Sequence, residues 1–297
     1  MFTRKFWHVL IVDDEPDIHE VTKLTLKKEE FFGVKLQLHH ANSAKEAMAL
    51  LSGDPVLARS IAVALVDVVM ETDHAGLDFC RFVREELHRK SIQLVLRTGQ
   101  PGQAPPRKII DDLSITNYLT KMEATGDRLY MTIKSSIQQF YETTITENWA
   151  QVLESLRAAA NTQEGLLTAL QKFLAQDMGQ GQEMNIALDF FGRSYAGGGY
   201  FKDKSAYDAV KADLLTRGEA QLSTTRNTAF YSESTSSVPN RVAKVDNYVI
   251  VQSSAIGTTE LATMVLKDPS YPRDQLSYYG PIWRLPLAWL AQAMVPR

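Results

Sequence analysis

The chain of 297 residues is long enough for about two domains, and its 44% hydrophobic and 23% charged residues are ordinary for a globular protein. The net charge of −3 gives no indication of a nucleic-acid or anionic-membrane partner, and the apolar runs are too short to span a membrane. The single cysteine, Cys80, excludes an internal disulfide bond and is expected to be a small core residue rather than a nucleophile. We therefore expect a cytoplasmic protein without a membrane anchor.

The first 125 residues predict strands that alternate with helices. Apolar or alternating runs predict strands over residues 6–14, 33–41, 61–69, 92–99 and 117–121. Helical spacing of apolar residues, in places with capping or proline signals, predicts helices over 15–30, 43–53, 76–89 and 105–113. This order is typical of an α/β fold with a doubly wound, five-stranded parallel sheet. Within the second strand, His39 and His40 lack the spaced partners of a metal site and are expected to be one surface and one core residue.

Charged and polar residues stand where these strands end. They are Asp13 and Asp14 after the first strand, Asp67 in the third, Thr98 in the fourth and Lys121 in the fifth. Ligands of parallel sheets bind beyond the carboxyl ends of the strands, so we expect these groups to meet at one edge. Three carboxylates there suit a hard cation such as Mg²⁺, which takes oxygen ligands. The alternatives are that Asp14 or Glu15 caps the next helix and that Asp67 belongs to a strand-end turn.

This constellation, in order along residues 5–124, resembles the receiver domain of two-component response regulators, which has a flavodoxin-like fold. The resemblance implies a receiver domain over residues 1–124. It implies that Asp67 is the phosphoacceptor and takes a phosphoryl group from a histidine kinase or a phosphotransfer protein. It also implies that Mg²⁺ is bound by Asp13, Asp14, Asp67 and the backbone carbonyl of Val69.

The same resemblance assigns roles to three residues on the last two predicted strands. Lys121 would pair with the phosphoryl oxygens, and Thr98 would move to hydrogen-bond them. Tyr118, three residues before the lysine, would rotate inward behind Thr98 as part of the switch. The residue types agree with this chemistry, because a carboxylate accepts a phosphoryl group only where the charges of both are offset.

Two places depart from the usual receiver pattern. In "DVVMETDHAG", Glu71 takes the place of the usual proline and Gly76 falls one residue late. Met122 follows Lys121, where receivers usually have a proline in a cis bond, and a cis bond before a non-proline residue costs about 3 kcal/mol. We therefore expect the loop after Asp67 to be shaped differently, and the turn after Lys121 to be either different or strained.

Two stretches, "METDHAGL" at 70–77 and "RTGQPGQAPPRK" at 97–108, resemble a narrower group of receivers. Members of this group precede a GAF-like domain of unknown function, often followed by an HD-GYP cyclic-di-GMP phosphodiesterase. The second stretch is rich in proline and glycine. It is either a rigid loop between a strand and a helix or a segment that carries the phosphorylation signal away from Thr98.

Residues 125–160 predict a helical linker. From Asp127 to Ala160 there is no proline or glycine, and apolar residues recur at three- and four-residue steps, with one slip near Ile145. These positions are Ile133, Ile137, Phe140, Trp149, Val152, Leu156 and Ala159. The stripe predicts pairing with a second copy in a homodimer, and the alternative is packing against the same chain.

Residues 161–297 predict an α+β domain. A helix over 162–176 is followed by a hairpin over 184–203, a helix over 205–218, a polar loop over 223–241 and paired strands over 247–254 and 261–268. The segment 273–295 predicts a closing helix kinked near Pro281 or Pro286. The part from residue 247 onward resembles a GAF-like domain, which implies a sensory or interaction function.

The leading hypothesis is a response regulator in which phosphorylation switches the conformation or association of the GAF-like domain toward a downstream signalling protein. Such a chain is a phosphoacceptor that can hydrolyse its own acyl phosphate, not a metabolic enzyme, and needs neither nucleic acid nor membrane as a partner. One alternative is a DNA-binding transcriptional regulator, but the second half shows no helix-turn-helix pattern and no Lys/Arg cluster. The other is a trimmed or degenerate cyclic-di-GMP phosphodiesterase regulator, although no paired histidine–aspartate hydrolase motif is present.

Overall fold

The computed structural model describes residues 6–99, 107–123, 126–159, 162–175, 185–224, 241–254, 261–267 and 287–295. The chain forms two compact units, one comprising Lys5–Thr144 and the other the residues from Ile145 onward. The long helix α6 (Gly126–Ala159) begins in the first unit and ends in the second. It corresponds to the helical linker expected over residues 125–160.

The first unit contains the predicted parallel sheet. Its parallel strands are β1 (Phe6–Val12), β3 (Val34–Ala41), β4 (Ile61–Asp67), β5 (Gln93–Thr98) and β6 (Asn117–Thr120). With the short strand β2 (Glu30–Phe31) at one edge, the order across the sheet is β2-β3-β1-β4-β5-β6. The central strands β1 and β4 are almost wholly buried, because helices cover both faces of the sheet.

Strand β2 was not predicted, so the sheet has six strands rather than five. The sequence predicted a helix as far as residue 30, but α1 (Pro16–Leu26) ends earlier and β2 pairs antiparallel with β3. The two strands are joined by Phe32 and Gly33, whose φ angles are 56° and 74°. Positive φ at both central residues makes the type of tight turn that matches the twist of a hairpin. Phenylalanine is a rare choice there, which explains why the turn gave no signal in the sequence.

The remaining helices of the first unit follow the predicted order. They are α2 (Ala44–Gly53), α3 (Pro55–Ser60), α4 (Ala75–Arg81), the π-helical turn η1 (Phe82–Glu86) and α5 (Arg107–Asp112). The predicted cap of α2 is confirmed, since the Ser43 hydroxyl accepts a hydrogen bond from the Glu46 amide at 3.1 Å. Helix α3 was not predicted. It is a single capped turn in which the Asp54 carboxylate accepts from the amides of Val56 and Leu57.

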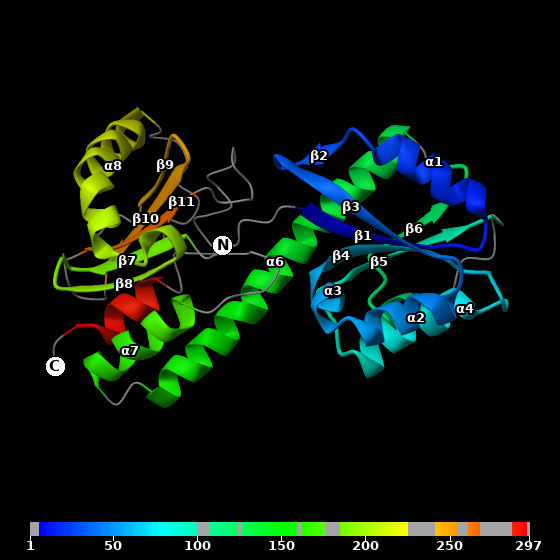
Figure 1. The fold of residues 1–297 in the computed structure, drawn as a ribbon, viewed down its shortest axis with the longest axis horizontal. Helices are drawn as coiled ribbons and strands as arrows, with labels where there is room; N and C mark the ends of the chain where they lie inside the picture. Colours follow the sequence, from blue (N-terminus) through cyan, green and yellow to red (C-terminus); the bar gives the residue numbers. More distant parts are fainter. Residues whose placement is uncertain are drawn as a thin grey trace. The chain divides into compact units, whose positions relative to one another are not determined.

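Helices lie on both faces of the sheet of the first unit (Figure 1), and buried apolar side chains form its core. On one face, alternate residues of β1 such as Leu10 and Val12 join a cluster with α2, α3 and α4. On the other face lie α1 and the first part of α6. Cys80 is fully buried in the first cluster and burial raises the pKa of its thiol to about 12, so the prediction of a core residue is confirmed.

Part of the apolar stripe of α6 is buried within the chain. Ile133, Ile137, Phe140 and Leu156 are each no more than 1% exposed. These four side chains are therefore buried without a second copy of the chain, as expected if the helix packs against its own chain. The side chains of Trp149, Val152 and Ala159 lie outside the described residues, and the homodimer stays a prediction. None of the helices in the part of the chain that the structure describes has the length and apolar composition that a membrane span requires.

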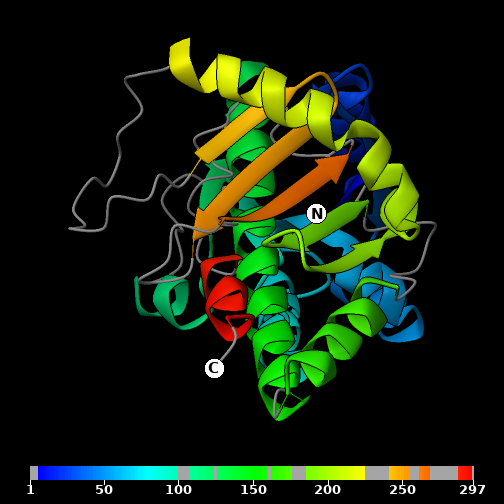
Figure 2. The ribbon, with the colours of Figure 1, turned by 90° about the vertical axis from the view of Figure 1, so that its left-hand side faces the viewer.

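The second unit is built on an antiparallel sheet in the order β8-β7-β11-β10-β9 (Figure 2). The strands are β7 (Ile186–Phe190), β8 (Ser194–Gly198), β9 (Arg241–Val245), β10 (Tyr248–Ser254) and β11 (Leu261–Lys267). The predicted hairpin of β7 and β8 and the predicted pairing of β10 and β11 are confirmed. Strand β9 was missed because it directly follows the polar segment predicted as a loop. Only three of its five residues, Val242, Ala243 and Val245, are apolar.

Helices lie on this sheet as expected of an α+β domain. Helix α8 (Lys204–Thr224) follows the short turn η2 (Gly199–Phe201) and packs on β9 and β10. Helix α7 (Gln163–Leu174) packs on β8, and its Gln163 side chain donates to the Met294 carbonyl at 3.1 Å. Residues 287–293 form a closing helix, whereas the predicted kink near Pro281 or Pro286 lies outside the described residues.

Four histidines of the first unit lie in two pairs. His8 Nδ1 lies 2.9 Å from His39 Nε2, and His19 Nδ1 lies 2.9 Å from His40 Nδ1. His40 is exposed, as expected of one of the two, but His39 is only half-buried rather than a core residue. Burial, together with the charge of His40, lowers the pKa of His39 below its ordinary value of 6.5, although Asp54 acts in the opposite direction.

We predict that acid destabilises the chain partly through His39. Because folding lowers its pKa, the unfolded chain binds the proton more tightly, so this contribution is present above pH 6.5 and is lost as the pH falls below it. Replacing His39 with Gln should reduce the drop in melting temperature between about pH 8 and about pH 5.5. The exposed His74 offers the control, and an equal drop in H39Q and H74Q would contradict the assignment.

Candidate metal centre at the edge of the first sheet

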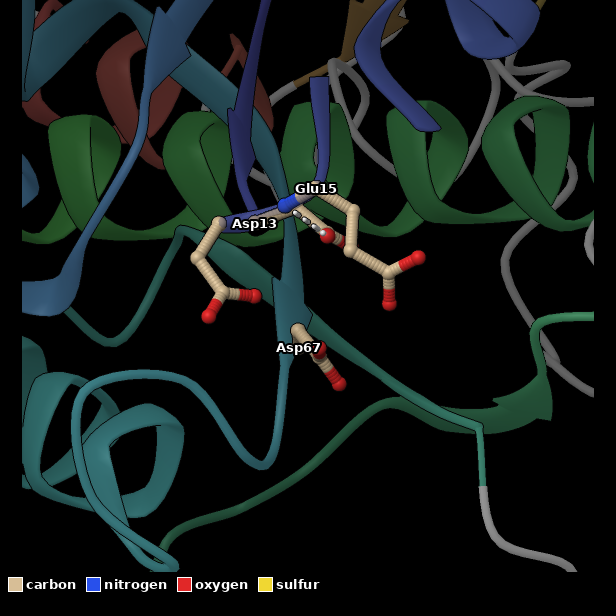
Figure 3. Close-up of side chains that lie close together, drawn as sticks. Asp13, Glu15 and Asp67 are labelled. Carbon is tan, nitrogen blue, oxygen red and sulfur yellow. Dashed lines mark hydrogen bonds between the residues drawn. The ribbon is translucent and has the colours of Figure 1, made fainter. Parts of the chain in front are cut away.

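The carboxyl ends of the parallel strands bring the predicted acids together. Asp13 follows β1 and Asp67 ends β4, the neighbouring strand. One carboxylate oxygen from each of Asp13, Asp14, Glu15 and Asp67 lies within 4.8 Å of the others. Figure 3 shows three of these side chains and the hydrogen bond from the Glu15 amide to Asp13 Oδ1, which is 3.1 Å long. The prediction that the acids meet at one edge is confirmed.

Lys121 stands among these acids as their main positive partner. Its Nζ lies 2.7 Å from Asp67 Oδ2, 2.6 Å from Glu15 Oε1 and 3.2 Å from Asp13 Oδ1. The backbone holds it there, since the Lys121 amide donates to the Thr98 carbonyl at 2.8 Å. The sequence predicted Lys121 but not the role of Glu15, which was considered only as a helix cap. Glu15 does precede α1, but its side chain makes no capping hydrogen bond.

The electrostatics of the centre follow from burial and mutual contact. Burial, with the charge of Asp13, raises the pKa of Asp67 above its ordinary value, although the hydrogen bond from Lys121 acts in the opposite direction. Burial alone would lower the pKa of Lys121, but its hydrogen bonds to Asp67 and Glu15 outweigh this and raise it. The lysine therefore stays charged at neutral pH and holds the acids together.

Arg97 is a second cation beneath the acids, and the sequence analysis missed it. It is fully buried on β5, with its guanidinium NH2 3.4 Å from Asp13 Oδ2 and its NH1 3.0 Å from the Thr22 hydroxyl on α1. Its Nε has no hydrogen-bond partner among the described residues. The available signal was that one arginine stands between the apolar run "LVL" at 94–96 and Thr98, because a buried arginine is rare without a paired acid.

The two switch candidates lie on neighbouring strands. Thr98, at the end of β5, is 2% exposed, and Tyr118 lies on β6, paired in register with Leu96. The Tyr118 ring packs against the core on the α2 face. Its hydroxyl is buried and has no hydrogen-bond partner among the described residues. Thr98 therefore ends β5 beside Thr120, the residue before Lys121, and Tyr118 lies two residues earlier on β6.

The two departures from the receiver pattern have local explanations. The Glu71 carboxylate accepts hydrogen bonds from the amides of Ala44 and Lys45 at the start of α2, both 3.2 Å long. The loop after Asp67 is thus tied to α2 by a side chain. The Lys121–Met122 bond is trans, and the turn continues with a hydrogen bond from the Glu123 amide to the Thr120 carbonyl at 3.0 Å.

The donor set of the centre fits Mg²⁺. The cluster offers only carboxylate oxygens, two of them on the exposed residues Asp14 and Glu15, so water and a phosphate can reach the same edge. Hard cations of this kind take oxygen ligands and keep several waters. Burial raises the pKa of Asp67, and hydrogen bonding from the Val69 backbone acts in the opposite direction. The residues that could hold the ion are Asp13, Asp14 and Asp67, with Glu15 as an additional acid.

The order of the strands defines the class of fold. Taken in chain order, the five parallel strands lie in the order second, first, third, fourth, fifth. This is the flavodoxin-like, doubly wound order, and the acids lie at its switch point between β1 and β4, where such folds bind ligands. The first unit therefore has a flavodoxin-like fold, which is consistent with a receiver domain.

No family model matches the chain, but two known proteins match parts of it. The 3′3′-cGAMP-specific phosphodiesterase 2 of Vibrio cholerae is 38% identical over 164 residues, which are 55% of this chain and 31% of that protein. The response regulator protein PilR of Pseudomonas aeruginosa is 31% identical over 90 residues, 30% of this chain and 18% of PilR. The chain therefore spans less than a third of the length of either relative.

Among solved structures, the chain is similar to the signal receiver domain of an HD domain-containing protein from Pseudomonas fluorescens. The identity is 19% and the TM-score 0.37, with 46% of this chain and 98% of that domain covered. The match to the Vibrio cholerae protein is longer than the unit Lys5–Thr144, so it includes residues outside that unit.

We predict that Gly76 is required for the shape of the centre. A Cβ atom at this position would lie 1.9 Å from the Asp67 carbonyl oxygen, so alanine must displace the backbone of Asp67. Gly76→Ala should destabilise the chain by about 1–3 kcal/mol and weaken its stabilisation by Mg²⁺. The control is Gly53→Ala, whose Cβ would meet no atom within 4 Å. Urea unfolding with and without Mg²⁺ measures both effects, and equal behaviour of the two variants would contradict the prediction.

Proposed function

We propose that the chain is a two-component response regulator that is phosphorylated on Asp67 in the presence of Mg²⁺. The observation that carries the proposal is the contact of 2.7 Å between the buried Asp67 carboxylate and Lys121, inside a group of four acids at the switch point of the sheet. The phosphoryl donor would be a histidine kinase or a phosphotransfer protein. The match to PilR supports this class of function.

The residues of the centre have the chemistry that phosphoryl transfer needs. An Asp67 carboxylate oxygen would form a bond to phosphorus while the phosphorus–nitrogen bond of the donor histidine breaks, and the electron pair returns to the imidazole. When bound at Asp13, Asp14, Asp67 and the Val69 carbonyl, Mg²⁺ would offset the charge of the phosphoryl oxygens. Lys121, already 2.7 Å from the carboxylate, would pair with a phosphoryl oxygen. Transfer of this kind depends mainly on positioning and electrostatics.

Thr98 and Tyr118 would report the phosphoryl group to the rest of the unit. The Tyr118 hydroxyl is buried without a partner among the described residues, and an unpaired buried hydroxyl costs about 1–3 kcal/mol. A rotation of the ring that gives this hydroxyl a partner would therefore be favourable. Movement of Thr98 toward the phosphoryl group would open the space for it.

The second unit would be a GAF-like domain that receives this signal. An antiparallel sheet preceded by α7 and followed by the helix at 287–293 is the arrangement expected of such a domain. Helix α6 would carry the signal, because it begins in one unit and ends in the other. Formation of a homodimer, or docking of a downstream signalling protein, would then be the output. On this proposal the chain is a phosphoacceptor and not a metabolic enzyme.

Replacing Asp67 with Asn should abolish incorporation of phosphate from acetyl phosphate with Mg²⁺. The amide cannot form the acyl phosphate, and intact-mass spectrometry would show the loss of the phosphoryl adduct. The matched control is Asp78→Asn, because Asp78 is half-exposed and pairs only with Arg81 among the described contacts. Persistent labelling of D67N to the level of D78N would refute the assignment of the phosphoacceptor.

A second candidate function is control of cyclic-dinucleotide hydrolysis. The observation that favours it is the identity of 38% over 164 residues with a 3′3′-cGAMP-specific phosphodiesterase. The chain itself contains no paired histidine–aspartate motif, so we infer that it would regulate hydrolysis rather than perform it.

Two measurements test this candidate. The purified chain should not hydrolyse 3′3′-cGAMP, whereas turnover would show that it is an enzyme. In the organism that encodes it, replacing the gene with a D67N copy should change the cellular level of cyclic dinucleotides, while a D78N copy should not. Equal levels in all strains would contradict a role in this pathway.

A further inference from the structure

The charges buried beneath the centre balance one another without a metal ion. Asp13 and Asp67 are 0% and 5% exposed in their side chains, and Arg97 and Lys121 are 1% and 12% exposed. These are two carboxylates and two cations, so the set has a net charge of zero. The other two acids of the group, Asp14 and Glu15, are exposed to solvent, which screens them.

Arg97 differs from Lys121 in that it does not face the ligand edge. Lys121 lies among the carboxylates on the side where Glu15 is exposed, and it contacts three of them. The guanidinium of Arg97 lies between the Asp13 carboxylate and the Thr22 hydroxyl. On the sheet, Arg97 is paired in register with Asp67 of the neighbouring strand β4. The planar group is held by two elements, and an arginine does not lose its proton in proteins. Its charge is therefore fixed in place.

A fixed cation close to a metal site opposes the binding of a second cation. In a medium of effective dielectric constant of about 20, unit charges several ångströms apart interact by a few kcal/mol, and a divalent ion doubles this. A phosphoryl group on Asp67 adds one further negative charge to the set, since the acyl phosphate dianion replaces a carboxylate. That added charge attracts the metal ion more strongly than the unphosphorylated set does.

We propose that Arg97 is an internal counter-ion that keeps Mg²⁺ binding weak until a phosphoryl group occupies Asp67, so that metal and phosphoryl group bind cooperatively. This inference rests on the proposed function of the centre. It assigns to Arg97 an electrostatic role, because the buried guanidinium holds its charge 3.4 Å from the Asp13 carboxylate without itself binding the ligand. The centre then responds to phosphorylation rather than to the ambient concentration of Mg²⁺.

A purely structural role for Arg97 predicts something different. If the guanidinium served only to fill space and pair with Asp13, its loss would destabilise the chain and weaken the binding of every ligand at the centre. A counter-ion role predicts the opposite effect on the affinity for Mg²⁺. Its loss should strengthen Mg²⁺ binding to the unphosphorylated chain, even where stability falls.

The experiment is a calorimetric titration of the full chain with Mg²⁺, with and without beryllium fluoride as a phosphoryl mimic. In the unchanged protein, Mg²⁺ should bind tighter when beryllium fluoride is present. In Arg97→Gln and Arg97→Leu, Mg²⁺ alone should bind on the order of tenfold tighter, and the gain from beryllium fluoride should shrink. Arg97→Lys keeps the charge and should behave like the unchanged protein.

The outcomes separate the two proposals. If the unchanged chain binds Mg²⁺ cooperatively with beryllium fluoride and the neutral variants bind Mg²⁺ no tighter than it does, the counter-ion role is wrong and the phosphorylation proposal stands. If the unchanged chain binds no Mg²⁺ in either condition, the proposed function of the centre fails, and the inference with it. Thermal unfolding of each variant shows whether it is folded. If Arg97→Leu does not fold, Arg97→Gln remains as a neutral variant, because its amide can still hydrogen-bond Asp13 and Thr22.

Discussion

The contact between Lys121 and Asp67 is the interaction on which the rest of the centre depends. Carboxylate oxygens within 4.8 Å of one another repel, and burial makes that repulsion stronger than it is in water. The lysine reverses the balance by approaching three of these groups at once. It can do so only because β6 pairs with β5 and delivers the residue after it to the same edge as β1 and β4. The last strand of the sheet, though short, therefore completes the centre.

The stability supplied by the apolar core around the sheet allows the fold to tolerate this concentration of buried charge. Strand β4 is buried along its whole length, and β1 is buried after its first residue. Burial of apolar side chains contributes about 25 cal/mol for each Å² removed from water, so a sheet covered on both faces has a large favourable term. Against it stand the desolvated charges of Asp13, Asp67 and Arg97, which are tolerated because each has an opposite charge nearby.

The features of the centre that could be predicted from the sequence are those fixed by the positions of the strand ends. Asp13, Asp67 and Lys121 could be placed together because parallel strands bring their carboxyl ends to one edge, whatever the details of packing. Arg97 could not be placed in this way, since its partners Asp13 and Thr22 are 84 and 75 residues away in sequence and meet it only through packing. The hairpin strand β2 was missed because its turn uses a phenylalanine at positive φ. Strand β9 was missed because pairing with β10, not its own pattern, defines it.

The hydrogen bonds of Glu71 have a consequence for how the loop beside Asp67 is held. A proline ring restrains a loop covalently and is indifferent to the solvent. Glu71 restrains it through two amides at the positive end of α2. Burial acts to raise the pKa of its carboxyl, but hydrogen bonds from its own backbone and from these two amides outweigh burial and lower it. Such a restraint is electrostatic, so added salt weakens it and protonation releases it. In this protein the stiffness of the loop is a property that the ionic surroundings can adjust, whereas a proline would build it into the chain.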